Sequence, residues 1–366
     1  MKDILSSNTS DRLEILRFPL IVLVIFIHSY NPITLLDESF RNNLIYSIHE
    51  FSLPLSIQFF ISNVFGVLAV PVFYFISGFL LLFNVEFNVN VYVSKIQSRF
   101  WSLFVPFLIF NGLTSASLLA LQMTGWADSI LNPSNRRLYD YTVAEGLAFT
   151  FGIDRLRPIL YQFWFIRDLI ILVFCSPILV ILLKKLPKTA LTLIGGAWLL
   201  NFNPLLYPNI EAVFFFSLGL WAAVHKRSPF LFDEFATAVV VVYGLYLFMS
   251  LPLAATAVSS YSSKAGIFLG FATALTLTKP LSKRPLGAYL ISLAPYSFFI
   301  FALHEPLLTI LRKIWLRLWG PSDLSQLFGY FLIPAVIIIA LILLYKVLEK
   351  HAEFLLRVVA GRRRNR

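Results

Sequence analysis

The segment Arg17–Tyr30 reads RFPLIVLVIFIHSY, with ten apolar residues between an arginine and a histidine. An α-helix has 3.6 residues per turn and rises 1.5 Å per residue, so the step from Arg17 to His28 is about three turns and about 16 Å. Both side chains then lie on one face of a helix. An ionisable ring inside a membrane-spanning helix is costly and marks a functional site by default. The spacing therefore predicts a guanidinium and an imidazole that face the same interior.

The composition is that of a membrane protein. Of the 366 residues, 58% are hydrophobic and only 13% are charged, and the mean hydropathy is +0.78. Soluble domains carry about 25% charged residues, so this chain has too little polar surface to cover a water-exposed globule. We predict an all-α, polytopic integral membrane helical bundle. Its expected location is the cell membrane, as a multi-pass protein of a bacterial inner or plasma membrane.

A membrane-spanning helix needs about 20 mostly apolar residues. The sequence offers about ten such segments, of which the fifth, sixth and eighth are short or interrupted. They lie near 14–32, 63–84, 101–122, 161–183, 189–206, 209–225, 234–255, 262–278, 286–310 and 326–348. We expect residues 1–350 to form a single transmembrane domain and residues 351–366 a basic cytoplasmic tail.

Three regions between these segments need separate interpretation. Segment 43–62 is apolar but contains His49, Glu50 and Pro54, and we interpret it as an interfacial or partly inserted helix. The long 123–160 loop is nearly charge-balanced and would cover a binding site on the outer face. The basic 311–326 loop fits the charge rule for outer loops least well.

Basic residues set the orientation and exclude one class of partner. Lysines and arginines are more frequent in the loops on the side of the two chain ends, so both termini are predicted to be cytoplasmic. The net charge of +11 comes from short clusters between apolar runs and from the C-terminal GRRRNR. That pattern favours anionic lipid headgroups over nucleic acid as the partner. The lone Cys175 is interpreted as a packing residue, and no cluster has metal-ligand spacing, so no metal is expected.

The sequence resembles the membrane acyltransferase-3 family. Members carry Arg or Lys, ten residues and then His in the first helix, as RLEILRFPLIVLVIFIHSY does here. Further similar segments follow in the family's order over about residues 12–310: PVFYFISGFLLLF (71–83), KIQSRFWSLFVPF (95–107), QFWFIRDLIILVFCSPIL (162–179), VFFFSLGLWAA (213–223) and SFFIFALHEPLL (297–308).

The resemblance implies an enzyme that transfers an acyl group, commonly acetyl, from cytoplasmic acyl-CoA to a hydroxyl. The implied acceptor is a carbohydrate of a surface polysaccharide or of its lipid-linked precursor. Coenzyme A carries several phosphate charges, which arginine binds through paired hydrogen bonds and lysine as a point charge. Arg17, Lys95 and Arg99 are the candidates for this role. The family usually has a second Arg where Ser102 stands, and Lys95 lies on the same helix face as Arg99 to compensate.

The chemistry needs a base and a donor to the thioester carbonyl. Histidine is the usual base near neutral pH, and His28 is the candidate. The carbonyl oxygen becomes negative in the transition state, so a nearby donor stabilises it. Ser77 and Arg167 are candidates for that donor, and Gly78 beside Ser77 permits a close approach of the backbone. Helix breakers such as Ser77-Gly78 would alternatively be kinks for packing.

Several polar residues are expected at the outer depth of His28. Arg167 and Asp168 start the fourth span, His304 and Glu305 end the ninth, and Glu211 starts the sixth. Together with His28 they would line one outward-facing cavity, in which His304 or Glu305 orients the acceptor or His28. Alternatively, Arg167 and Asp168 anchor a helix start, His304 and Glu305 form a helix end near water, and Glu211 is interfacial.

Two questions stay open at this stage. A secondary transporter or a flippase for a sugar or small anion would also keep Arg, His and Asp inside its spans, although no repeated halves are visible. For an acyltransferase, the donor is cytoplasmic while the acceptor is often outside. Either the acyl arm reaches deep along the first helix, or a covalent carrier or a second protein bridges the distance. The acceptor, the acyl chain and the oligomeric state are not determined by the sequence.

Overall fold

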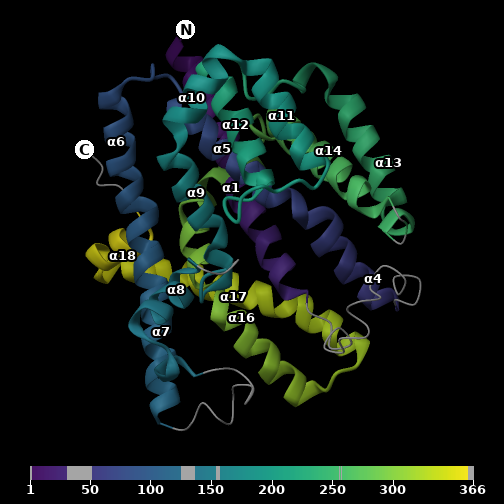
Figure 1. Ribbon diagram of the computed structural model, residues 1–366. Helices are drawn as coiled ribbons and strands as arrows, with labels where there is room; N and C mark the ends of the chain where they lie inside the picture. Colours follow the sequence, from purple (N-terminus) through teal and green to yellow (C-terminus); the bar gives the residue numbers. More distant parts are fainter. Residues whose placement is uncertain are drawn as a thin grey trace.

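The protein is a bundle of helices built around its first helix (Figure 1). The computed structural model describes residues 2–30, 52–124, 137–153, 157–254, 256 and 258–361, and this part of the chain contains helices and no strands. Helix α1 (Lys2–Ser29) runs through the middle of the bundle and packs against elements from both halves of the chain. This arrangement puts the Arg17–His28 face inside protein rather than against lipid.

Helices occupy all ten segments in which spans are expected. After α1 the helices are α4 Leu53–Phe59, α5 Ala69–Leu82, α6 Val89–Arg99, α7 Val105–Met123, α8 Val143–Phe151, α9 Trp164–Phe174, α10 Ser176–Lys185, α11 Pro187–Leu199, α12 Ile210–Val224, α13 Ala236–Ala254, α14 Ser259–Leu281, α15 Pro285–Leu293, α16 Ser297–Trp319, α17 Asp323–His351 and α18 Glu353–Val359. Within the described ranges, five helical stretches are long and apolar enough to cross a membrane, and a sixth is counted if the pair α9–α10, bent by 60°, is one span. The protein is a multi-pass membrane protein, and ten spans stay a prediction.

Three expected boundaries are wrong. Segment 53–62 is not a separate helix: α4 continues through a π-helix η3 (Phe60–Phe65) and a 3₁₀ turn η4 (Gly66–Leu68) into α5, and Leu53–Leu82 is one candidate span, so of the two alternatives partial insertion stays open. Pro54 sits in the first helical turn, where proline is tolerated. Residues 43–51, with His49 and Glu50, lie outside the described residues. The expected 311–326 loop is mostly helical, since α16 continues to Trp319. Within 123–160, residues 143–151 form α8, which begins with a Thr142–Glu145 capping box.

Helices α5 and α12 touch through their backbones at two glycines. A Cβ added at Gly78 would lie 2.1 Å from the carbonyl oxygen of Phe216, and one at Gly219 would lie 2.1 Å from that of Phe75. This is small-residue packing, which lets membrane helices approach closely. The close approach expected at Gly78 therefore exists, but its partner is α12 rather than a ligand.

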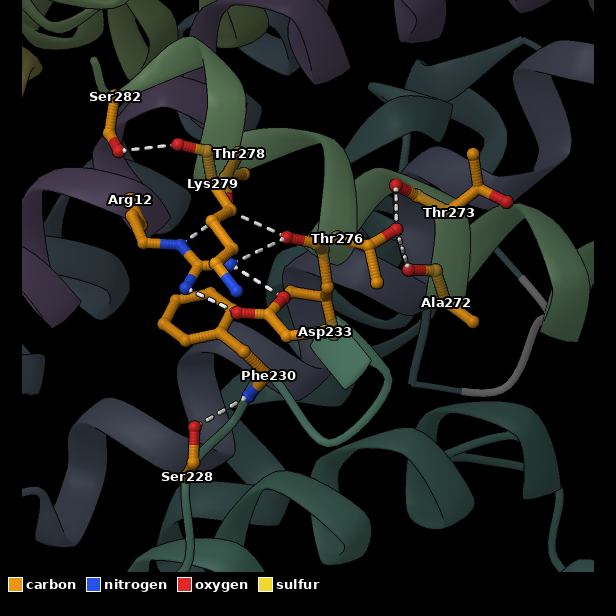
Figure 2. A network of polar contacts seen from close by, with 11 residues as sticks. Arg12, Ser228, Phe230, Asp233, Ala272, Thr273, Thr276, Thr278, Lys279 and Ser282 are labelled. Atoms are coloured by element: carbon orange, nitrogen blue, oxygen red, sulfur yellow. Dashed lines mark hydrogen bonds and ion pairs between the residues drawn. The ribbon is translucent and has the colours of Figure 1, made fainter. Parts of the chain in front are cut away.

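Helix α1 is anchored by Arg12 at the end of the bundle where the chain begins (Figure 2). Arg12 forms a bidentate ion pair with Asp233, with both N–O distances 2.8 Å. Its Nε donates to the hydroxyl of Thr278 at 2.9 Å, and its guanidinium lies 3.4 Å from the centre of the Phe230 ring. Arg12 is thus fully occupied by α14 and by the turn that precedes α13, and it acts as an anchor of α1.

Replacing Gly78 by alanine should destabilise the protein, because helix backbones rather than flexible side chains would have to move. We expect the free energy of unfolding to fall by about 1–3 kcal/mol. Thermal unfolding of the purified protein in detergent measures the change. The matched control is Gly244→Ala in α13, where a Cβ meets no atom within 4 Å, so that the variant should keep or slightly gain stability. Equal stability of the two variants would contradict the close α5–α12 contact.

Removing the partner of Arg12 should also destabilise the protein, since the guanidinium would stay buried without its counter-ion. For Asp233→Ala we expect a loss near the lower end of the roughly 3–5 kcal/mol seen for broken buried pairs, because Asp233 keeps some exposure. Glu86→Ala is the control. Its ion pair with Lys226 is exposed on both sides, and solvent screens it, so little change is expected. A stable Asp233→Ala variant would argue against the anchor.

Candidate active site

One cavity combines the polar residues of α1 with walls from distant parts of the chain. Its volume is about 360 Å³, within the range of small-molecule sites. The wall comes from α1, α5, the end of α6 with the π-helix η5 (Phe100–Phe104) that follows it, the start of α9, the turn η10 (Ala294–Tyr296) with α16, α17 and the turn after α18. Most wall residues are apolar or aromatic, and the few polar ones are Arg17, His28, Ser77, Arg99, Ser102, Gln162, Ser297 and Tyr345. Such a lining suits a ligand with a long, weakly polar arm.

Arg17 and His28 both line this cavity, so the expectation that they face one interior is confirmed. The packing of α5 against α1 shows how deep along the α1 axis the other wall residues lie. Gly66, where the η4 turn leads into α5, touches Ile27. Ser77 is eleven residues further along this descending helix, about 16 Å away. Ser77 therefore lies near the level of Arg17 rather than that of His28.

The imidazole of His28 is held between two rings. It stacks on His304, with ring centres 5.3 Å apart and planes at 26°, and Tyr161 meets it edge-on at 4.9 Å. Nδ1 of His304 lies 2.8 Å from the carbonyl oxygen of Phe301. Carbonyl oxygens only accept, so Nδ1 carries the proton. Nε2 of His304 is then an acceptor, and it has no partner in the described part of the chain.

A break in α16 brings a carboxylate to the same place. Glu305 has non-helical backbone angles (φ −104°, ψ 140°) and precedes Pro306, which cannot continue the helical hydrogen bonds. The hydroxyl of Tyr161 donates to Oε1 of Glu305 at 3.0 Å. His28, His304, Tyr161 and Glu305 thus form one cluster. Of these four only His28 lines the cavity, so the expectation that His304 and Glu305 also line it is not met. Among the residues that the structure describes, no group of three His, Cys, Asp or Glu side chains is arranged to hold a metal.

Arg167 and Asp168 do not line the cavity that contains His28, in contrast to the expectation. Arg167 donates to Asp168 and to the carbonyl oxygen of Gly152, and its guanidinium stacks on the Tyr207 ring. Asp168 also accepts from the backbone N–H of Asn209. These contacts brace the start of α9 against its neighbours, which is the alternative role considered for the pair.

Three further candidates lie off the cavity wall. The carboxylate of Glu211 accepts from the indole N–H of Trp198, 3.2 Å away. Gly78 packs on α12 and Lys95 stays on α6 outside the wall, whereas Arg17, Arg99 and Ser77 line it. The wall of the cavity thus retains three of the five residues expected to bind the donor.

Sequence reasoning missed four parts of the site. Tyr161 and Gln162 precede the Trp164–Phe174 helix, and Ser297 starts α16. The turn Ala360–Gly361 closes the wall near Ser102: Gly361 has φ +58°, and an added Cβ would lie 2.5 Å from the carbonyl oxygen of Ser102. The beginning of the expected tail is therefore part of the folded body. A polar Gln inside the aromatic run YQFWF was the available signal for the first two.

Comparison with known proteins agrees with this geometry. The family model described as an acyltransferase domain, acyltransferase 3, matches residues 10–345. The chain is 26% identical over 374 residues to the succinoglycan biosynthesis protein ExoH of Rhizobium meliloti (strain 1021), covering 98% of this chain and 94% of that protein. No solved structure matches the chain. Because the family match extends from before Arg12 to Tyr345, and so includes the central helix and most of the cavity wall, the chain belongs to the acyltransferase-3 family.

Proposed function

We propose that this protein is an O-acyltransferase of a bacterial plasma membrane. It moves an acyl group, with acetyl as the first candidate, from cytoplasmic acyl-CoA to a hydroxyl of a carbohydrate. The observation that carries the proposal is the single cavity that joins the guanidinium groups of Arg17 and Arg99 to the imidazole of His28. A polysaccharide or its lipid-linked precursor is the proposed acceptor, because the relative ExoH is named for succinoglycan biosynthesis.

The donor would lie along the length of the cavity. Its phosphates would pair with Arg17 and Arg99, since guanidinium groups bind phosphate oxygens through two parallel hydrogen bonds. The pantetheine arm would follow the apolar wall, where Phe73, Phe165 and Phe298 exclude water. Ser77 and Ser297 would offer hydrogen bonds to the amides of the arm. The thioester would then reach His28, about 16 Å from Arg17 along α1.

His28 would act as the general base. The acceptor oxygen attacks the thioester carbonyl carbon while its proton passes to the imidazole. When the C–S bond breaks, the thiolate leaves as coenzyme A and takes the same proton from His28. The stacked His304 and the edge-on Tyr161 fix the ring, and Glu305 holds Tyr161 in place through its hydrogen bond. A base held by its neighbours in this way needs little rearrangement during the reaction.

Replacing His28 by alanine should reduce acyl transfer without loss of fold. Removal of a positioned base typically costs about 10²–10⁴-fold in rate. The assay measures thiol release from acetyl-CoA by purified protein, together with mass spectrometry of surface glycans for the added acyl mass. His351→Ala, at an exposed position near the end of α17, is the control. A protein that moves a solute without consuming thioester would instead support the transporter alternative.

Replacing Arg17 by glutamine should weaken donor binding more than turnover. Loss of hydrogen bonds to a charged group costs about 1.5–3 kcal/mol, so we expect the dissociation constant for coenzyme A to rise roughly 10- to 100-fold. The control Arg227→Gln removes the same charge at an exposed site off the cavity. It should leave the dissociation constant for coenzyme A unchanged. Equal affinities of the two variants would exclude Arg17 as a phosphate ligand.

The C-terminal turn gives an independent test of where the donor binds. In Gly361→Val the new side chain would meet the backbone of Ser102, so the turn must leave the cavity wall. We expect coenzyme A to bind several-fold more weakly. Gly320→Val shares the positive φ, and hence the backbone strain, but a Cβ there meets no atom within 4 Å. If both variants bind coenzyme A like the parent protein, the donor does not contact this turn.

A further inference from the structure

We propose that Gln162 is a catalytic residue whose side-chain amide donates a hydrogen bond to the carbonyl oxygen of the donor thioester. This inference rests on the proposed acyltransferase function. It assigns the group that stabilises the negative oxygen of the transition state, a role for which the sequence suggested Ser77 or Arg167.

The side chain of Gln162 is buried without a partner. It is 1% exposed and lines the cavity, yet neither Nε2 nor Oε1 has a hydrogen-bond partner in the described part of the chain. A buried amide without partners costs free energy, and most buried polar groups avoid this state. A cavity-lining amide in this state is explained if a ligand supplies the missing partner.

The backbone around Gln162 is fixed on both sides. The preceding residue, Tyr161, contacts His28 and donates to Glu305. One residue earlier, the backbone N–H of Leu160 donates to the side chain of the buried Asn111 at 3.2 Å. Phe163, on the other side, is fully buried against Phe107, Phe110 and Phe301. Donors that are held in place before the reaction stabilise developing charge at little reorganisation cost.

Position along the cavity separates Gln162 from the other wall donors. Ser77 lies near the level of Arg17, as its distance along the helix from Gly66 indicates. Ser297 is seven residues before His304 in α16, about 10 Å away along the helix. Gln162, by contrast, directly follows the residue whose ring touches His28. Because Gln162 and His28 line the same cavity, a thioester carbon within reach of His28 can place its oxygen beside the Gln162 amide.

The reaction step balances with this assignment. As the acceptor oxygen bonds to the carbonyl carbon, the π electron pair moves onto the carbonyl oxygen, and the Nε2–H group of Gln162 hydrogen-bonds to it. The acceptor proton is on His28 at this stage. The oxygen then re-forms the double bond, the C–S bond breaks, and the sulfur receives the proton from His28. Gln162 neither gains nor loses a proton.

The test uses the full-length protein in detergent with acetyl-CoA labelled with ¹³C at the thioester carbonyl. Infrared difference spectra should show the carbonyl band of bound acetyl-CoA at lower frequency than in water, because a directed hydrogen bond weakens the C=O bond. Gln162→Leu should abolish this extra shift, while His28→Ala should retain it. Thiol release should fall about 10²–10³-fold in Gln162→Leu, the range known for loss of one such donor, with the dissociation constant changed less than about tenfold.

If Gln162 had only a structural role, its replacement would lower the unfolding temperature. Leucine has a similar size and no unpartnered polar atoms, so Gln162→Leu should unfold at the same temperature as the parent protein or at a higher one. An unchanged band or unchanged thiol release in Gln162→Leu overturns the assignment. If the parent protein neither binds nor cleaves acetyl-CoA, the proposed function fails with this donor, and the assignment fails with it.

Discussion

The arrangement depends on how α1 is held. Arg17 and His28 act together only if this helix keeps both its rotation and its depth, because one residue of slippage would turn each side chain by about 100°. The ion pair of Arg12 with Asp233, five residues before Arg17, opposes such slippage at one end. At the other end Gly66 fits against Ile27, and Ser62 donates to the carbonyl oxygen of Phe26. The helix face that carries Arg17 and His28 is thus fixed from both ends.

Buried polar groups inside the bundle differ in their hydrogen-bond partners and in their position relative to the cavity. Arg12, Arg167 and Asn111 lie off the cavity wall, and each has protein hydrogen-bond partners, as is required where no water can replace them. On the wall, Gln162 and Ser297 have unpartnered polar atoms. The partnered groups stabilise the fold, whereas the unpartnered groups on the wall are available to a ligand. A missing partner alone does not mark a ligand site, because buried Ser217 and Thr273 also lack partners in the described part of the chain and lie off the wall. The missing partner and the position on the cavity wall together distinguish Gln162.

The same distinction explains how far sequence reasoning reaches. Helical periodicity along one segment was enough to place Arg17 and His28 on a shared face, and hydropathy located the helices. Depth in the membrane, however, does not determine which way a side chain points. Arg167 and Asp168 lie near the start of helix α9, but they turn toward Gly152 and Asn209. Gly78 packs against Phe216 of α12, 138 residues further along the chain, a contact that local patterns do not encode. The role of Gly361 depends on a similar long-range contact.

The geometry also bears on how an acyl group from the cytoplasm would meet an acceptor on the other side. A covalent carrier needs a nucleophile on the route. Cys175 is exposed at the bend between α9 and α10 and does not line the cavity, whereas the hydroxyls of Ser77 and Ser297 do. The cavity itself is continuous from Arg17 to His28, a separation of about 16 Å along α1. An extended pantetheine arm lying in it would carry the thioester past the middle of the first helix while the phosphates stay near its inner half. Of the three routes considered, direct reach of the donor is the one for which the cavity supplies the needed length, because Arg17 and His28 line the same space.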